Sequence, residues 1–370
     1  MPDIWIRTDG NEKIATGHLM RCLSIARACA DHQKSVCFLV ADTQSETLLQ
    51  ERFAFPSEFE IKCLHSDYQD MEKELPALEY IMNREHSSSE HILPQKKPWI
   101  LVDSYYVTAP YLEALRNWGY VAYLDDLALF SYPVDCIINY DVSENKKPDC
   151  YNAAARCLLG TAYTPLRAQF QDVPYVVRRD VEHILISTGG TDPFHIAEKL
   201  LDRMIVKSHI KAEAEQLSDS VLSVPTHYKY HILTSQLNSC YNKLMALSSK
   251  YPNIYIYENV KDMAGLMSRC DLAVSAGGTT LYELCAVGVP TISFVMADNQ
   301  LSAVETFAAS DIIPCAGDAR IDIDGVLDAI WHFLVEKQMS YSKRLELSDK
   351  MRSFVDGYGA VRIAEALGFM

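Results

Sequence analysis

The sequence lacks the cysteine spacings that build disulfide frameworks or zinc sites. Its 370 residues include 11 cysteines but no CxxC pair. Most of these cysteines, such as Cys37, Cys136 and Cys285, stand inside apolar runs, where a free thiol packs as a small apolar side chain. The pattern therefore favours a reducing cytoplasm over a disulfide scaffold, and we expect neither a bound metal nor a cofactor.

Long apolar runs and an excess of positive charge are also missing. The longest apolar stretch, residues 284–297, is interrupted by Gly288 and Pro290 and is too short to span a bilayer. The first ten residues resemble a strand rather than a signal peptide. With 34 Lys and Arg against 49 Asp and Glu, the formal net charge is -15. We therefore expect no binding to nucleic acid or to membranes.

Short apolar runs alternate with helical patterns along the chain, which predicts parallel sheets covered by helices. Strands are expected at 4–8, 36–40, 60–64, 99–103, 121–125 and 136–139, and again at 183–187, 228–233, 254–257, 272–275 and 291–295. We predict two Rossmann-like α/β domains, at residues 1–165 and 180–345. Residues 346–370 are expected to form closing helices that return to the first domain. The stretches 83–98 and 211–225 show no clear pattern.

The most informative stretch is DLAVSAGGTTLYELCAVGVPTISF, at residues 271–294. It predicts a buried strand, a tight turn at Gly277 and Gly278, a helix from about Thr279 and a second buried strand. Such a turn lets a ligand approach the backbone at the positive end of a helix, which suits a phosphate. Glu283, one helical turn further on, is placed to accept hydrogen bonds from ribose hydroxyls. The stretch therefore predicts a nucleotide diphosphate site.

Two further polar clusters follow expected strands of the second domain. Asn299 and Gln300 come just after the strand at 291–295 and are candidates for contact with the diphosphate or the sugar. Gly189 and Gly190 follow the strand at 183–187, with Pro193 expected as the first helical residue. That second glycine turn could approach the same ligand, or it could serve only as a structural turn.

The first domain contains a candidate general base. The first expected strand ends just before Asp9. The loop after it leads to Gly17 and His18, where a helix is expected to begin. The positive end of a helix dipole disfavours an imidazolium, and a neutral imidazole can accept a proton. A histidine that only caps or packs is the alternative. Cys22 lies on the same helical face, where a core residue is favoured over a nucleophile.

Carboxylates and a tyrosine follow two other strands at the same expected sheet edge. Asp103 ends the fourth strand and is followed by Tyr105, while Asp125 ends the fifth. Asp103 or Asp125 could orient His18, hydrogen-bond a sugar or cap a helix. Tyr105 could contact a sugar ring, or it could only lie at the rim of the site. Two acids without a third ligand indicate a metal site only weakly.

These motifs together resemble the PseG-type family of UDP-2,4-diacetamido-2,4,6-trideoxy-β-L-altropyranose hydrolases, a group that includes spore coat polysaccharide proteins. The matching segments are GHLMRCLSIA, DSY, DDL, LLGTAYTPLRAQF, STGGTDP, AGGTTLYELCAVGVP and DNQ, in order over about 300 residues. The resemblance implies a MurG-like GT-B fold, with two parallel sheets facing a central cleft. Two departures are Ala15, where the family has glycine, and the insert at 83–98.

The resemblance also implies roles for individual residues. His18 matches the family's catalytic histidine, and its substrate would be a UDP-linked amino sugar, split by water at the anomeric carbon into UDP and free sugar. The substrate-binding set that we expect is Asp9, Gly17, Asp103, Tyr105, Arg167, Gly189, Gly190, Gly277, Gly278, Thr279, Glu283, Asn299 and Gln300. A glycosyltransferase is the main alternative, followed by an epimerase and a non-catalytic binding module. We expect a monomer.

Overall fold

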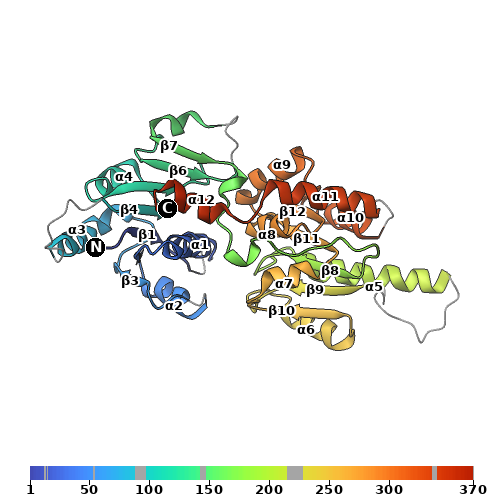
Figure 1. The fold of residues 1–370 in the computed structure, drawn as a ribbon. Coiled ribbons are helices and arrows are strands. Elements are labelled where there is room, and N and C mark those ends of the chain that lie inside the picture. Colours follow the sequence, from blue (N-terminus) through green and yellow to red (C-terminus); the bar gives the residue numbers. More distant parts are fainter. Residues whose placement is uncertain are drawn as a thin grey trace. The chain divides into compact units, whose positions relative to one another are not determined.

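The structure is a computed structural model that describes residues 1–11, 14, 16–52, 55–87, 97–141, 147–214, 228–335 and 340–369. Its backbone divides into two compact units (Figure 1). One unit comprises Met1–Ala168 and Gly357–Met370, and the other comprises Gln169–Asp356. Ala15, most of the insert at 83–98 and residues 215–225 lie outside the described residues. Within the described residues, no helix is long and apolar enough to cross a membrane.

The first unit is built on a parallel seven-stranded sheet in the order β3-β2-β1-β4-β5-β6-β7. Its strands are β1 (Ile4–Thr8), β2 (Val36–Val40), β3 (Glu60–Cys63), β4 (Trp99–Asp103), β5 (Tyr120–Leu124), β6 (Cys136–Asn139) and β7 (Arg156–Leu159). Its α-helices are α1 (Gly17–Asp31), α2 (Thr43–Arg52), α3 (Leu75–Ser87), α4 (Ala109–Leu115) and α12 (Gly359–Ala366). The short helices of this unit are η1 (Met71–Glu74), η3 (Asp149–Ala153) and η4 (Thr161–Tyr163), while η5 (Ala168–Phe170) starts at the end of the segment Met1–Ala168 and continues into the second unit.

The expected strands of this unit are present, with shifts of one residue at β3 and β5. The sequence pattern missed β7, because its four residues RCLL include an exposed arginine and a half-buried cysteine at the sheet edge. Helices α3 and α4 bury their apolar faces on one side of the sheet, in a core that includes Trp5, Val102 and Tyr111. Strand order reverses between β1 and β4, and ligands of open α/β sheets bind at such a switch point.

Helix α12 packs against α1 and η4 within the first unit. Its first residue, Gly359, lies so close to Thr164 that an added Cβ would stand 2.1 Å from the Thr164 carbonyl oxygen. The docking also uses Arg362, whose guanidinium donates to the Ala162 carbonyl at 2.9 Å. The end of the chain therefore belongs to this unit, whereas the helix before it, α11 (Tyr341–Phe354), belongs to the other.

We predict that Gly359→Ala loosens the docking of α12. The new methyl group would overlap the Thr164 backbone, which cannot move aside as a flexible side chain would. We expect a loss of about 1–3 kcal/mol in the free energy of unfolding, the usual cost of overpacking. Urea titration measures this change. Glu365→Ala, at an exposed position of the same helix, is the control and should stay within about 0.5 kcal/mol of the parent. Equal stabilities of the two variants would contradict the prediction.

The second unit carries a parallel six-stranded sheet in the order β10-β9-β8-β11-β12-β13. Its strands are β8 (His183–Ser187), β9 (Lys229–Leu233), β10 (Ile254–Tyr257), β11 (Leu272–Ala276), β12 (Thr291–Val295) and β13 (Cys315–Asp318). Its helices are α5 (Ile196–Ala214), α6 (Tyr241–Lys250), α7 (Met263–Ser268), α8 (Thr279–Val287), η7 (Asp298–Gln300), α9 (Leu301–Ala309), α10 (Ile323–Val335) and α11. The sequence pattern missed β13, because CAGD has no apolar run.

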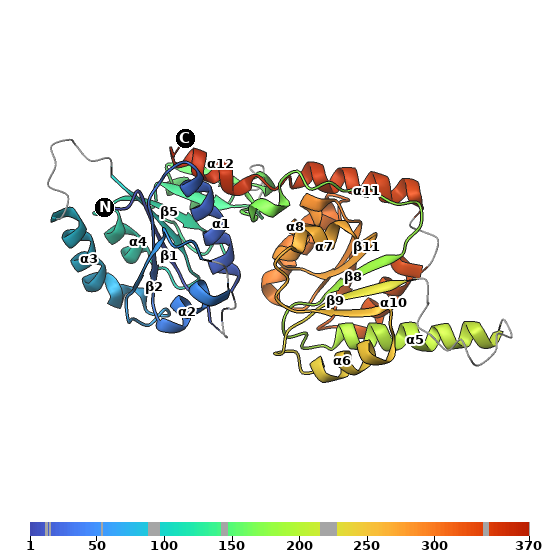
Figure 2. The ribbon, with the colours of Figure 1, turned by 60° about the horizontal axis from the view of Figure 1, so that its bottom comes forward.

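Helices cover both faces of this second sheet (Figure 2). Helices α5, α6 and α10 share one apolar core with the strands, around Ile186, Leu200 and Ile330. On the other side α8 packs against α7 and α11. Strand order reverses between β8 and β11, so the loops after these two strands flank the switch point. The prediction of two α/β units with parallel sheets is therefore confirmed.

A chain of histidine and tyrosine side chains crosses β8, β9 and β10. His183 Nδ1 lies 2.8 Å from His231 Nε2, and His231 Nδ1 lies 3.0 Å from the Tyr257 hydroxyl. The two imidazoles are stacked, with 5.1 Å between ring centroids. Burial, followed by the neighbouring charge of His183, lowers the pKa of His231 to about 4. Burial and the charge of Lys229 also lower the pKa of His183.

This histidine pair predicts a loss of stability in mild acid. An unfolded histidine takes up a proton near pH 6.5, whereas folded His231 resists protonation down to about pH 4. The unfolded state therefore binds more protons in this window, and the free energy of unfolding falls as pH falls from about 6.5 to 4. We expect His231 to contribute about 2 kcal/mol to this fall, after allowance for solvent screening.

Urea titrations at several pH values test this prediction. We expect His231→Gln to flatten the fall between pH 6.5 and 4, since glutamine does not titrate. His65→Asn, at an exposed histidine with a left-handed backbone, is the control and should keep the parental slope. A parental slope in His231→Gln would show that the pair does not drive the acid sensitivity.

Candidate functional site

The strand ends of the first unit bring His18 and Asp103 together. Asp103 is the last residue of β4 and pairs in register with Thr8, the last residue of β1. His18 is the second residue of α1, the helix that comes directly after β1 in the chain. The His18 Nδ1 atom lies 2.5 Å from Asp103 Oδ1. Both side chains are buried, at 7% and 0% exposure, so bulk water competes little for this contact.

The Asp103 carboxylate determines which nitrogen of His18 is basic. An ionised carboxylate only accepts hydrogen bonds, so Nδ1 carries the proton that it donates to Asp103. The lone pair of the neutral imidazole is then on Nε2, which is available to take up a proton. Of the two acids considered from the sequence, Asp103 orients His18. Asp125 instead accepts from the Tyr151 and Tyr132 hydroxyls, at 2.5 and 3.1 Å.

Arg21 fixes the Asp103 carboxylate from the next turn of α1. Its Nε and NH2 donate to the two Asp103 oxygens at 2.7 and 2.6 Å. Its guanidinium also donates to both Asp126 oxygens, each at 2.9 Å, and to the Tyr140 hydroxyl at 2.7 Å. Burial alone would raise the pKa of Asp103, but the charge of Arg21 and the hydrogen bonds from Arg21 and His18 hold that pKa well below its usual range. The carboxylate therefore stays ionised at physiological pH.

Arg21 and Tyr140 were not among the expected site residues, and Asp126 was considered only as part of the DDL motif after the fifth strand. Arg21 stands three residues after His18, and this spacing places two side chains on one helical face. That spacing was the available signal for Arg21. No comparable signal existed for Tyr140, which follows the sixth strand and meets Arg21 only through the fold.

Tyr105 and Cys22 line the same cluster. The Tyr105 ring meets the His18 ring edge-on, with 4.6 Å between centroids and 80° between planes, which restricts rotation of the imidazole. Burial, followed by the charge of Asp126, raises the pKa of Tyr105, so it remains a phenol. Burial and the charge of Asp103 raise the pKa of Cys22. Its protonated thiol lies 3.4 Å from Asp103 Oδ2 and agrees with the expected packing role.

Three other expected residues of the first unit lie in different surroundings. Asp9 is buried, pairs with Arg7 and accepts from the Ala41 N–H at 2.7 Å, so both of its oxygens serve the fold. Gly17 is the first residue of α1, and an added Cβ there would meet nothing within 4 Å. Arg167 is close enough to Arg27 that burial and the Arg167 charge together lower the Arg27 pKa. Arg27 is more than two turns of α1 away from His18.

In the second unit, the two glycines of the turn after β11 differ in their surroundings. An added Cβ on Gly277 would stand 2.4 Å from Val304 Cγ2 and 3.0 Å from Gln300 Cβ. Gly277 therefore lets the start of α9 pack on the turn. Gly278 is the N-cap of α8 and has open space where a Cβ would point. Gly277 thus makes room for α9, whereas Gly278 has the open space that the predicted ligand contact would need.

The start of α8 lies at an exposed part of this turn. Thr279 is its first residue and is exposed, and the first N–H groups of any α-helix have no partner within the helix. Glu283 is half-buried one turn further along. Asn299 is exposed in η7, whereas Gln300 Oε1 accepts from the Met296 N–H at 2.8 Å. Gln300 therefore already helps to shape the loop beside the turn.

The glycine turn after β8 differs from expectation at its helix start. Gly189 has a left-handed backbone, with φ of +76°, and the Gly190 carbonyl accepts from the Ser235 hydroxyl at 2.8 Å. Pro193 is not the first helical residue, because α5 begins at Ile196. The Asp192 side chain instead accepts from the Ile196 and Ala197 N–H groups, each at 2.9 Å, and so caps the helix.

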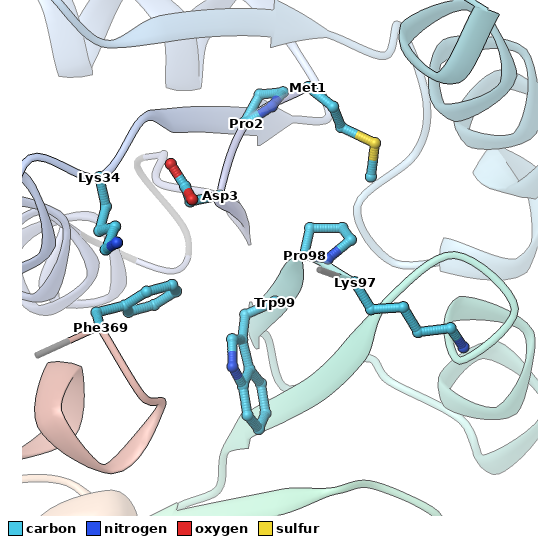
Figure 3. Close-up of a pocket in the computed structure, with 8 residues that line it drawn as sticks. All are labelled: Met1, Pro2, Asp3, Lys34, Lys97, Pro98, Trp99 and Phe369. Carbon is cyan, nitrogen blue, oxygen red and sulfur yellow. The ribbon is translucent and has the colours of Figure 1, made fainter. Parts of the chain in front are cut away.

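A pocket of about 260 Å³ in the first unit lies apart from these residues (Figure 3). It is lined by Met1, Pro2, Asp3, Lys34, Lys97, Pro98, Trp99 and Phe369. Asp3 precedes β1 and Trp99 begins β4, so the pocket is at the amino ends of these strands. The His18 cluster is at their carboxyl ends, which is where open α/β sheets bind ligands.

Comparison with known proteins relates both sequence and fold to nucleotide-sugar proteins. Residues 184–330 match the glycosyltransferase family 28 C-terminal domain. The chain is 26% identical over 235 residues to the spore coat polysaccharide biosynthesis protein SpsG of Bacillus subtilis, covering 63% of this chain and 64% of SpsG. It is also 23% identical over 221 residues to the Helicobacter pylori protein named pseudaminic acid cytidylyltransferase and UDP-2,4-diacetamido-2,4,6-trideoxy-beta-L-altropyranose hydrolase. That match covers 58% of this chain and 35% of the relative.

Solved structures match nearly the whole chain. Acinetobacter baumannii MurG superimposes with a TM-score of 0.64 and 14% identity over 99% of both chains. An Arabidopsis thaliana protein, UGT89C1 complexed with UDP, gives a TM-score of 0.58 and 11% identity, again over 99% of both. These likenesses support the predicted GT-B fold, and the sequence matches support the resemblance to PseG-type proteins. Part of the second unit thus matches the glycosyltransferase family 28 C-terminal domain, in a chain with a GT-B fold that is similar in sequence to SpsG and to the Helicobacter pylori protein.

Proposed function

We propose that the chain hydrolyses a UDP-linked diacetamido-trideoxy sugar to UDP and the free sugar, in the synthesis of pseudaminic acid or a related surface polysaccharide. The observation that carries the proposal is the buried pair of His18 and Asp103, with Nδ1 of the histidine 2.5 Å from the carboxylate. A protein that only binds a nucleotide sugar needs no oriented base. The name of the Helicobacter pylori relative, which includes this hydrolase activity, and that of SpsG also support the proposal.

In this proposal His18 acts on water. Nε2 takes one proton from the water molecule while the water oxygen forms a bond to the anomeric carbon, on the face opposite UDP. The bond between that carbon and the phosphate oxygen breaks, and UDP leaves with the electron pair. The ionised Asp103 stabilises the imidazolium that forms. Arg21 keeps this carboxylate in place, and Asp126 balances the charge of the guanidinium.

The proposed leaving group, UDP, would bind at the turn after β11. The backbone N–H at Thr279 and the positive end of α8 would then stabilise the charge that develops on the diphosphate. One such oriented donor is typically worth about 3–4 kcal/mol in the transition state. Neither a metal nor a covalent nucleophile is needed in this scheme, since UDP is already a good leaving group.

The remaining expected residues keep their proposed roles as substrate contacts. Glu283 would accept from the ribose hydroxyls, and Asn299 and Gln300 would contact the diphosphate or the sugar. Gly189 and Gly190 would admit the diphosphate to the turn after β8. Tyr105 would orient the sugar or the attacking water. Asp9 already makes contacts within the fold, and Arg167 lies near Arg27, more than two turns of α1 from His18, so the structure adds no support for a substrate contact by either residue.

The two turn glycines offer a matched test of the diphosphate site. Gly278→Ala should fold normally, because its methyl group meets nothing within 4 Å. It should weaken UDP binding by about 10–100-fold, because the methyl group keeps the phosphate from charge-assisted hydrogen bonds. Gly277→Ala should instead destabilise the fold by about 1–3 kcal/mol, because its methyl group would overlap Val304.

Isothermal titration with UDP and urea unfolding measure both effects of these glycine variants. We expect Gly278→Ala to lose affinity for UDP while it keeps its stability, and Gly277→Ala to lose stability. Parental affinity in a folded Gly278→Ala would place the diphosphate elsewhere.

A glycosyltransferase remains the second candidate, and the match to the family 28 glycosyltransferase domain is the observation that favours it. The same His18 would then deprotonate an acceptor hydroxyl in place of water. Release of UDP from a panel of UDP-amino sugars, with and without added acceptors, separates the two functions. The hydrolase releases UDP without an acceptor, most rapidly from the diacetamido-trideoxy sugar. Release that requires an acceptor would overturn hydrolysis and favour transfer.

A further inference from the structure

The loops after β8 and β9 of the second unit bring together three side chains that can ligate metals. His195 directly precedes α5, and Glu198 is in the first turn of that helix. Cys240 is the N-cap residue of α6. One ligand atom from each residue lies within 4.8 Å of the other two. Among the residues that the structure describes, this is the one group of at least three histidine, cysteine or acidic side chains with such spacing.

Neighbouring side chains already orient two of these ligands. His195 Nε2 lies 3.2 Å from the Ser239 hydroxyl oxygen, which leaves Nδ1 directed to Glu198, with 3.8 Å between Nδ1 and Oε2. The other Glu198 oxygen, Oε1, accepts from Lys243. Glu198 Oε2 and His195 Nδ1 therefore face each other across a gap that is too wide for a hydrogen bond.

The dimensions of this gap suit a transition-metal ion. Zinc binds cysteine sulfur at about 2.3 Å and histidine nitrogen or carboxylate oxygen at about 2.0–2.2 Å, in tetrahedral geometry. Ligand atoms on one such ion are then about 3.3–3.8 Å apart. The 3.8 Å between His195 Nδ1 and Glu198 Oε2 is slightly wider than the roughly 3.3–3.6 Å that a histidine nitrogen and a carboxylate oxygen take on one such ion, so a small side-chain rotation is needed. The Cys240 sulfur lies within 4.8 Å of the other two ligand atoms, and rotation about its side-chain bond can bring it closer.

The charges around the cluster also suit a dication. The ligands supply one carboxylate and, after deprotonation, one thiolate. Lys243 adds one positive charge, and its second partner, Asp202 at 3.0 Å, adds one negative charge. With a bound dication, these charges sum to zero.

We propose that His195, Glu198 and Cys240 bind a divalent transition-metal ion, with Zn²⁺ preferred and water as the fourth ligand. A mixed set of imidazole, carboxylate and thiolate suits Zn²⁺ better than Mg²⁺ or Ca²⁺. On binding, the Cys240 S–H bond breaks, the sulfur forms a bond to the metal, and the proton leaves to solvent. The ion joins the start of α5 to the start of α6. Its role is structural, and it is independent of the proposed hydrolysis.

Titration of the metal-free full chain with Zn²⁺, and with Co²⁺ as a spectroscopic probe, tests this site. We expect binding of one equivalent, release of one proton from Cys240, and a sulfur-to-cobalt charge-transfer band. At a zinc concentration of about 100 times Kd, Tm should rise by roughly 5–10 °C. The parent without metal should remain folded by circular dichroism, because the apolar core of this unit does not depend on the ion.

Matched variants distinguish a built site from adventitious binding. Cys240→Ser should abolish the cobalt–sulfur band. His195→Gln should weaken Zn²⁺ binding by more than about 100-fold, which exceeds the usual loss of affinity on replacing a residue that only supports a metal ligand. Cys315→Ser, which removes an exposed cysteine elsewhere in the same unit, should bind as the parent does. Loss of the band in Cys315→Ser, its persistence in Cys240→Ser, or no saturable binding by the parent would overturn the proposal.

Discussion

Replacing His18 with glutamine should lower kcat for UDP-sugar hydrolysis by about 10²–10⁴-fold, the usual contribution of a general base. Glutamine keeps a hydrogen bond to Asp103 but offers no basic nitrogen. UDP affinity should stay near the parental value, because the proposed diphosphate turn lies in the other unit of the chain. Steady-state kinetics and UDP titration measure the two effects separately.

The control for this substitution is His32→Gln, at the C-cap of the same helix. It changes the same residue type on α1 without touching Asp103, so kcat should remain parental. A parental kcat in folded His18→Gln would contradict the assignment of the base. A loss of UDP affinity together with kcat would indicate instead that His18 serves binding.

Asp103→Asn should lower both activity and stability. The amide can present its NH₂ group to His18 Nδ1, which favours the tautomer with the proton on Nε2 and so removes the base. A loss of about 10³–10⁴-fold in kcat is expected from such a change. Arg21 also loses a bidentate ionic partner in a buried site, and the free energy of unfolding should fall by about 3 kcal/mol. Kinetics across pH and urea titration report these two effects.

Asp125→Asn provides a matched control, since Asp125 is an equally buried acid at the end of the neighbouring strand. It holds the Tyr151 and Tyr132 hydroxyls and does not contact His18. We expect this variant to lose stability but to keep kcat per folded molecule. Equal losses of kcat in both variants would show that Asp103 acts only through the fold.

Much of the fold could be predicted from sequence because the central strands of both sheets are continuous apolar runs. β1, β4, β8 and β12 match their expected bounds, since both faces of each strand are buried. The edge strands β7 and β13 were not predicted, because a partly exposed strand of four residues has no distinctive hydrophobic pattern. The start of α5 was misplaced because the Asp192 cap outweighs the preference of Pro193 for a first helical turn.

The candidate site could be predicted only in part. The sequence placed His18 and Asp103 at the same edge of one sheet, because strand ends follow directly from the strand pattern. It could not show that Arg21 connects Asp103 to Asp126, since those contacts span 82 and 105 positions along the chain. It also could not separate Gly277 from Gly278, because only the packing of Val304 distinguishes them.

In the proposed hydrolysis, water attacks the anomeric carbon. Turnover of the diacetamido-trideoxy UDP-sugar in water enriched in heavy oxygen, without any acceptor, followed by mass spectrometry of the products, tests this claim. We predict that UDP is released without the heavy isotope, because the bond between carbon and the phosphate oxygen breaks. Heavy oxygen in the UDP would show attack at phosphorus and would contradict the account, as would the absence of UDP release until an acceptor is added.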